Sequence, residues 1–522
     1  MAFGLGFQPG YLLPALAIVI AAAAWHRPLS PRATQAACWM ALAMLVVAAS
    51  LRTVVIIWSL RGGAPSGWDA GIQAIAGAWL HGQPLQPALR DGLFYRWAYG
   101  PLHYEIVGLT QTWLGIGNPL VGLPMALAEL AAVIVTWRVA RSMGIGRGAS
   151  TAAAGIMVAE LSLLDLGGVR SDQLLLLLAA LGLAAARSVG RQGGAAFLLG
   201  LCGGLSMALK FTGFLYVVPA LLPILARPGN ARLRTLGFVA LGGALGAITP
   251  YLLPGAGITL EIFREETSNF RPMVSAFGHN LLFTIIALLP PLLWCRAEQS
   301  SARAAELGWI VAPWLPIFVI ACNGAAGPWH FAPFLPAVTL CLARSLDEHR
   351  AVDARRLILI GALALLVTVE VRQRVPRLFD RADAASNARL QQRIRGFLQA
   401  HPADEIAIGS GYGRRVAGGA SNTDVTFFQA EIPRANRTLR FMEQSYVLVN
   451  SAATAGIVTQ DLMRDCTVRY WITAPGPVFS GRLYDSSLER AFHAKYRLVR
   501  SETDMAIWAC KIRDGAGTTA AS

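Results

Sequence analysis

A set of polar side chains in this 522-residue sequence lies in or beside long apolar segments. Ionisable groups at membrane depth are costly, so each is a functional candidate unless a partner neutralises it. Acids and bases are both present, as a site would need if it bound a phosphate-linked donor and activated a hydroxyl. The candidates are Arg52, Asp69, Tyr99, His103, Glu105, Asp172, Lys210, Arg271 and His330.

The three acids also have structural explanations. Asp69 comes just before a helical pattern, where it either caps the helix or points at a substrate. Asp172 serves as an N-cap, pairs only with Arg170, or contributes to the site. Glu105 is either a solvated acid near a helix N-terminus or a catalytic group. We favour a catalytic role for Asp69, because several other features of the sequence around it match a catalytic loop.

The basic candidates have alternatives of the same kind. Arg52 can extend its guanidinium to the membrane interface and have no other role. Lys210 stands between two apolar half-segments, where it can simply anchor a helix end. His330, in the stretch GPWHFAPFLP, can be an interfacial residue.

The composition is that of a polytopic membrane protein. Hydrophobic residues make up 55% of the chain and charged residues 14%, and the mean hydropathy is +0.48. The net charge of +15 comes mainly from arginines in short loops between apolar segments. That distribution encodes orientation in a membrane, so we reject nucleic acid as a partner.

Apolar windows predict about twelve transmembrane helices, since a spanning helix needs roughly 20 residues. The first window lacks a cleavage site, so we expect a retained helix. The windows are 9–25, 37–60, 119–137, 150–166, 173–189, 194–209, 211–226, 235–254, 278–295, 307–322, 330–345 and 356–371.

Arginine placement predicts the orientation of these helices. Basic residues concentrate in alternate loops, which we therefore place in the cytoplasm. These loops are 27–32, 138–147, 187–191, 227–234, 296–303 and 344–356. Both chain ends then face outward, and the first external loop covers about 61–118 with two helices on the membrane surface. We expect a bacterial inner-membrane protein whose site faces the periplasm.

The chain divides into a transmembrane domain, 1–371, and an external α/β domain, 372–522. Cys466 and Cys510 are the only cysteines of the external domain, and they form either a disulfide or two buried thiols. The glycine-rich GSGYG is most simply a turn. Predicted strands are 405–409, 424–428, 445–449, 468–473, 496–499 and 505–510, and predicted helices are 386–400, 457–465 and 483–494.

The first external loop resembles that of GT-C glycosyltransferases. The matching features are Asp69, the stretch AWLHGQPL that follows it, and YGPLHYEIVG. Similarity continues through RSDQLLLLLAALGLAAA, through the glycine-rich segment that leads to Lys210, and to HFAPFLPAV. It covers about 40–345. The group includes protein O-mannosyltransferases and the aminoarabinose transferase that acts on lipid A.

The resemblance implies that Asp69 is the catalytic carboxylate, with Asp172 and Lys210 at the donor site. The implied activity is transfer of a sugar from a polyprenyl phosphate to a lipid, glycan or protein acceptor, with inversion. Ala70 after the lone Asp69, and Tyr99-Gly100-Pro101, depart from the family pattern and leave the sugar and acceptor open. No metal-ligand cluster is evident, so no cofactor is assigned and a divalent metal stays open. The alternatives are a transporter or flippase of a lipid-linked sugar, and a surface-polysaccharide ligase or polymerase.

Overall fold

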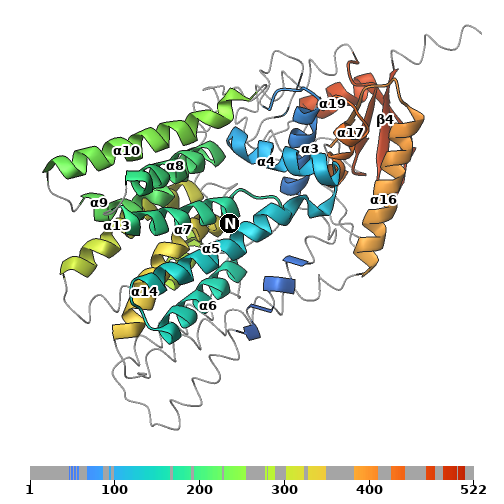
Figure 1. Ribbon diagram of the computed structural model, residues 1–522. Helices are drawn as coiled ribbons and strands as arrows, with labels where there is room; N and C mark the ends of the chain where they lie inside the picture. Colours follow the sequence, from blue (N-terminus) through green and yellow to red (C-terminus); the bar gives the residue numbers. More distant parts are fainter. Residues whose placement is uncertain are drawn as a thin grey trace, which may run out of the picture. The chain divides into compact units, whose positions relative to one another are not determined.

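The computed structural model groups the chain into two compact units (Figure 1). Unit 1 comprises 1–58, 123–249 and 271–379, and unit 2 comprises 59–122, 250–270 and 380–522. The structure describes scattered positions between 46 and 57, positions 93, 95, 277 and 278, and the ranges 67–85, 99–164, 168–189, 193–225, 229–253, 280–288, 301–322, 327–348, 381–409, 425–440, 466–475, 486–502 and 504–511.

Unit 1 is helical. Its apolar windows form helices because leucine, alanine and valine can satisfy the backbone internally while presenting apolar side chains all round. The named elements are α5 (Leu123–Ser142), α6 (Arg147–Leu163), α7 (Asp172–Ser188), α8 (Gly193–Leu209), η3 (Phe211–Leu221), α9 (Leu222–Leu225), α10 (Gly229–Ile248), η4 (Thr249–Leu252), α13 (Ser301–Ala321), η5 (Pro328–Phe334) and α14 (Leu335–Glu348).

Glycines let α8 and α10 pack backbone against backbone, and the two helices run side by side in Figure 1. A Cβ on Gly200 would lie 1.9 Å from the carbonyl oxygen of Val239, and one on Gly204 would lie 2.1 Å from that of Gly243. Small residues at four-residue spacing permit this approach between helices, a common arrangement in membranes.

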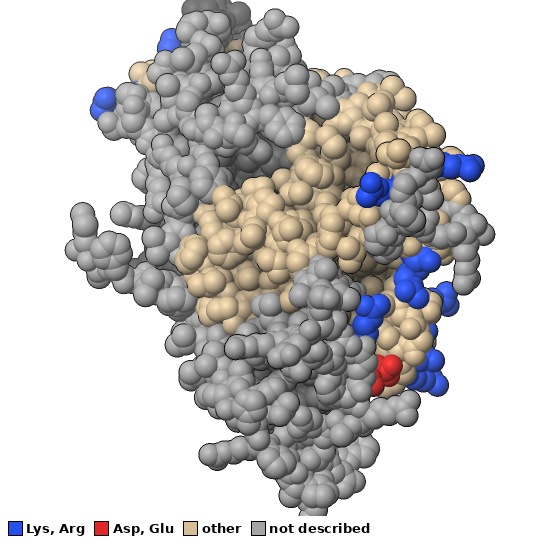
Figure 2. Space-filling model, turned by 90° about the vertical axis from the view of Figure 1, so that its left-hand side faces the viewer, with Lys and Arg blue, Asp and Glu red and all other residues tan. Residues whose placement is uncertain are grey.

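Two helices of the described chain are long and apolar enough to cross a membrane, by length and composition: Leu120–Ser142 and Arg232–Leu252. Leu241 and Ile248 on the second are more than half exposed. Figure 2 shows one face whose middle carries no charged side chain among the described residues, with most of the Lys and Arg toward the right-hand edge and others at the upper left. The expected number of twelve spans stays a prediction, and the windows 9–25 and 356–371 lie outside the described residues.

Unit 2 combines helices of the first loop with the C-terminal sequence. The loop supplies α3 (Gly67–Leu80), α4 (Pro101–Leu114) and η2 (Pro119–Gly122). Both predicted loop helices are therefore present. The C-terminal sequence forms α16 (Arg381–Ala400), β1 (Ile406–Ile408), η6 (Val425–Phe428), α17 (Glu431–Arg434), β2 (Tyr470–Thr473), α19 (Ser486–Lys495), β3 (Tyr496–Ser501) and β4 (Ala506–Cys510).

The C-terminal strands form one mixed sheet in the order β1-β2-β4-β3. β1 pairs with β2 in parallel, and the other pairs are antiparallel. Cys466, before β2, is joined by a disulfide to Cys510 at the end of β4, with Cα atoms 6.0 Å apart. The predicted strand 424–428 is wrong: Val425–Phe428 is a 3-10 turn, because this apolar run packs as a connection against α3, β1 and β2 instead of pairing in the sheet.

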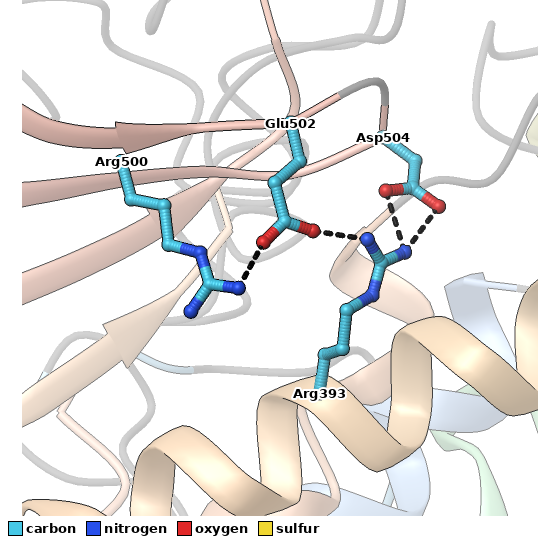
Figure 3. A network of polar contacts seen from close by, with 4 residues as sticks. All are labelled: Arg393, Arg500, Glu502 and Asp504. Carbon is cyan, nitrogen blue, oxygen red and sulfur yellow. Dashed lines mark hydrogen bonds and ion pairs between the residues drawn. The ribbon is translucent and has the colours of Figure 1, made fainter.

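A charged network ties α16 to the turn between β3 and β4 (Figure 3). Arg393 on α16 donates to Glu502, and its Nη2 lies 2.7 and 2.6 Å from the two carboxylate oxygens of Asp504. Arg500 approaches the other oxygen of Glu502 at 2.5 Å. The C-terminal helix and sheet therefore form one packed body.

Candidate functional site

Lys210 stands at a break in the backbone of unit 1. α8 ends at Leu209, and Lys210 is extended, with φ −158° and ψ 132°, before η3 begins at Phe211. Gly213 makes the break tight, because a Cβ there would lie 1.9 Å from the carbonyl oxygen of Ser206. The break turns the side chain of Lys210 away from the direction that a continuous helix would give it.

The ammonium of Lys210 meets two groups from other segments. Its Nζ lies 3.4 Å from Oδ1 of Asp172 and 2.7 Å from Nδ1 of His330. Asp172 is fully buried, and Lys210 and His330 are 9% and 8% exposed. The structure therefore brings together three of the predicted site residues, from the start of α7, the α8–η3 break and η5.

A cation–aromatic contact borders this cluster. The guanidinium of Arg170 lies 4.9 Å from the ring centroid of Trp329, the neighbour of His330. Phe334 at the end of η5 packs edge-to-face against Tyr216 of η3, with centroids 4.9 Å apart. Short helix η5 is thus fixed by aromatic packing, which holds His330 toward Lys210.

The chemistry of each group fixes its hydrogen-bonding role in this cluster. Ammonium can only donate, so Nδ1 of His330 accepts from Lys210 when the lysine is charged. Asp172 is the first residue of α7, so it is not the N-cap that the sequence suggested; Ser171 takes that position without a side-chain cap bond. The described residues offer Oδ2 of Asp172 and the side-chain oxygens of Ser171, Gln173 and Ser206 no hydrogen-bond partner, although all four atoms are buried.

Arg52 forms a buried ion pair with Glu129 of α5. Its Nε lies 2.6 Å from Oε1 and its Nη2 lies 2.5 Å from Oε2, the two-pronged geometry that suits guanidinium and carboxylate. Arg52 is only 4% exposed, so a carboxylate of α5 neutralises its guanidinium, and the alternative of an extension to the membrane interface does not apply. Sequence reasoning missed Glu129, although it is the one acid in the apolar window 119–137.

Asp69 lies in the first turn of α3 in unit 2 and is 8% exposed. Because α3 begins at Gly67, Asp69 is inside the helix and not ahead of it, as the sequence suggested. A carboxylate in a first helical turn interacts favourably with the helix dipole. Burial at this position also sets Asp69 apart from a solvated surface acid.

Tyr99 and His103 are in contact where α4 begins, and Glu105 lies in the second turn of the same helix. The rings of Tyr99 and His103 have centroids 4.9 Å apart. Glu105 is 3% exposed, so it is not the solvated acid considered above. Burial raises the pKa of its carboxyl to about 7, because the charged form loses hydration. A carboxyl with that pKa can carry a proton near neutral pH.

Asp172, Lys210 and His330 belong to unit 1, and Asp69, Tyr99, His103 and Glu105 belong to unit 2. Arg271 lies outside the described residues. Arg170 and Trp329 were not singled out as site residues, although both adjoin candidates in sequence. Over the described part of the chain, no group of three or more His, Cys, Asp or Glu residues is arranged to hold a metal ion.

No family model matches the sequence, and no curated protein matches it. Among solved structures, ArnT from Cupriavidus metallidurans bound to undecaprenyl phosphate matches with a TM-score of 0.55 at 15% identity, over 89% of this chain and 97% of ArnT. ArnT in the apo state matches with a TM-score of 0.53 at 14% identity, over 92% and 98%.

The oligosaccharyltransferase of Archaeoglobus fulgidus, in a complex with Zn and sulfate, matches with a TM-score of 0.44 at 13% identity, over 90% of this chain and 73% of that protein. The fold assignment rests on the two ArnT structures, because they cover nearly all of both chains. The chain therefore has the fold of ArnT, which confirms the fold predicted from the resemblance of its first external loop.

Proposed function

We propose that this protein is an integral-membrane glycosyltransferase that moves a sugar from a polyprenyl phosphate to an acceptor on the periplasmic side. The observation that carries the proposal is the buried cluster of Lys210, Asp172 and His330 in a chain that shares the fold of ArnT. ArnT was solved with undecaprenyl phosphate bound. A buried ammonium beside apolar helices suits such a ligand, since it meets the phosphate where the prenyl chain meets lipid.

Unfilled hydrogen-bonding capacity supports a polar ligand at this cluster. Within the described residues, buried oxygens of Ser171, Asp172, Gln173 and Ser206 lack partners. Each such group costs about 1–3 kcal/mol when left unsatisfied. A ligand with hydroxyl groups, such as a sugar, would relieve that cost by donating to these oxygens.

In the proposed reaction, Asp69 accepts the proton of the acceptor hydroxyl while its oxygen attacks the anomeric carbon. The bond from that carbon to the phosphate oxygen breaks, and polyprenyl phosphate leaves with both electrons of the bond. Lys210 stabilises the negative charge that develops on the phosphate. Attack opposite the leaving group inverts the anomeric configuration. General-base assistance of this kind contributes roughly 10² to 10⁴ in rate.

The test is transfer by purified protein. Labelled polyprenyl phosphate sugars, both hexosyl and pentosyl, are incubated with the protein and candidate lipid, glycan or peptide acceptors. Transfer requires Lys210, so Lys210→Met abolishes it, whereas Lys495→Met on α19 of the C-terminal domain leaves it unchanged. Movement of intact labelled lipid across vesicles without transfer would instead identify a transporter.

The periplasmic orientation is part of the proposal. Loops rich in arginine, such as 138–147, are assigned to the cytoplasm. A reporter fused after Gly146 should therefore be cytoplasmic, and one fused after Ser522 should be external. Finding both on the same side would contradict the orientation.

A further inference from the structure

The segment 425–440, which we call the docking segment, is fixed to the C-terminal domain. Glu431 within it is 2% exposed and accepts from Arg395 of α16 at 2.6 and 2.9 Å and from Gln391 at 2.6 Å. Gln429 donates to the carbonyl of Ile408 in β1. Bonds to both the helix and the sheet make the docking segment part of that domain and not a free loop.

The docking segment contacts α3, the helix that carries Asp69. A Cβ on Gly77 would lie 3.0 Å from Cγ of Pro433 and 3.2 Å from Cγ2 of Ile116, so the side chain of Pro433 packs directly against the backbone of α3. Just after α3, the amide of Gln83 accepts from the backbone N–H of Leu439 at 2.8 Å and donates to its carbonyl at 3.3 Å. Gln83 thus pairs with Leu439 in the way that a neighbouring strand would.

Helix α4 supports the other side of α3. A Cβ on Gly108 would lie 2.8 Å from the ring of Trp79, and Gln111 donates to the carbonyl of Gln73 at 3.0 Å. Helix α3 is therefore held by α4 and by the docking segment. Asp69 is eight residues before Gly77, about 12 Å along a rigid helix, so a shift at Gly77 moves the carboxylate as well.

We infer that the C-terminal domain positions Asp69 for transfer, and that Gly77, Pro433, Gln83 and Leu439 are the positioning residues. The inference rests on the proposed role of Asp69 as the base. Rate depends steeply on such geometry: a displacement of about 1 Å can lower turnover by about 10²-fold. The domain thus has a part in catalysis without touching the reacting atoms.

The experiment compares Gly77→Ala with Gly396→Ala in the full-length protein. Gly396 lies in α16, where an added Cβ would meet nothing within 4 Å. Alanine favours helix over glycine by about 1 kcal/mol, so a loss at Gly77 has to come from its contacts. We expect Gly77→Ala to lower kcat by about tenfold, with the KM for donor and the Tm unchanged, and Gly396→Ala to match the parent.

Rescue separates positioning from a general defect. Pro433→Ala deletes the atom nearest to the new methyl group, so the double variant Gly77→Ala/Pro433→Ala should regain at least half of the lost kcat. A second route is Gln83→Leu, which keeps the volume and removes both bonds to Leu439. It should also lower kcat more than it changes the KM. Parent-like kcat in Gly77→Ala and Gln83→Leu, or no rescue, would overturn the inference.

Hydrogen exchange provides a readout that does not need transfer. Gly77→Ala should speed amide exchange across α3, including its first turn, while Gly396→Ala should not. If the parent protein transfers no sugar, the proposed function fails. Faster exchange in Gly77→Ala would then still support the contact between docking segment and α3, and unchanged exchange would overturn that contact too.

Discussion

Nζ of Lys210 lies 2.7 Å from Nδ1 of His330, although 120 residues separate the two in sequence. Because an ammonium can only donate, this contact assigns Nδ1 as the acceptor and leaves the proton of a neutral ring on Nε2. His330 therefore orients Lys210 and presents its single N–H, at Nε2, on the other side of the ring. Asp172, 3.4 Å from the same ammonium, offsets its charge.

The first prediction concerns His330. His330→Ala removes the nitrogen that accepts a hydrogen bond from Lys210. A buried N–H group left without a hydrogen-bond partner costs about 1–3 kcal/mol. The free energy of unfolding should fall by about the same amount, as measured by denaturant unfolding in detergent. His330→Asn is the matched control, because its amide oxygen can take the place of Nδ1, and it should lose less. An equal loss in His330→Ala and His330→Asn would contradict the role of Nδ1 as the hydrogen-bond acceptor for Lys210.

Asp69→Asn tests the proposed base. Asparagine keeps the shape of the side chain but cannot take up the proton, so turnover should fall by about 10² or more while donor binding persists. Asp172→Asn should reduce turnover less, because Asp172 pairs with Lys210 instead of meeting the acceptor. Transfer by Asp69→Asn at nearly the parent rate would exclude a catalytic role for Asp69.

Replacing either Arg52 or Glu129 alone should destabilise unit 1, whereas replacing both together should not. Removing one partner leaves a buried charge and costs about 3–5 kcal/mol, whereas replacing both with apolar residues is often neutral. Glu129→Met should therefore lower the Tm in detergent, and the double variant Arg52→Met/Glu129→Met should restore it. If the double variant folds but no longer binds donor, Arg52 also contacts the donor.

Close packing of α8 and α10 predicts that alanine at two different glycines of α8 will have very different effects on the Tm. Gly200→Ala places a methyl group 1.9 Å from the carbonyl oxygen of Val239, so the helices must separate. A Cβ on Gly203 would meet nothing within 4 Å. Thermal unfolding should show a lower Tm for Gly200→Ala than for Gly203→Ala, and similar values would argue against this packing.

The raised pKa of Glu105 predicts that the stability of the protein depends on pH. Its pKa is raised from 4.5 to about 7 on folding, so its favourable contribution is complete below about pH 4.5 and is lost as pH rises through 7. Glu105→Gln cannot ionise and should gain stability relative to the parent between pH 5 and pH 8. Denaturant unfolding at pH 5 and at pH 8 measures the stability difference between Glu105→Gln and the parent. A difference that is the same at both pH values would show that burial does not raise the pKa of Glu105.

Local pattern was enough to predict most of the elements that the structure describes. Apolar runs became helices such as α7 and α8, and runs rich in β-branched or aromatic residues became β2 and β4. The stretch 424–428 failed because a short apolar run has the same composition in a strand and in a buried turn. Composition and spacing do not show whether a neighbouring strand is available to pair with it.

The sequence by itself determined which residues carry the acid and base groups, because residue type fixes that chemistry, and it determined the loop pattern that predicted the fold. Only the tertiary structure decided which of them meet: Lys210 with His330, Arg52 with Glu129, and α3 with the docking segment. These contacts join residues up to several hundred positions apart. They depend on helix rotation and on the α8–η3 break, whereas periodicity reports only which face of an element is apolar.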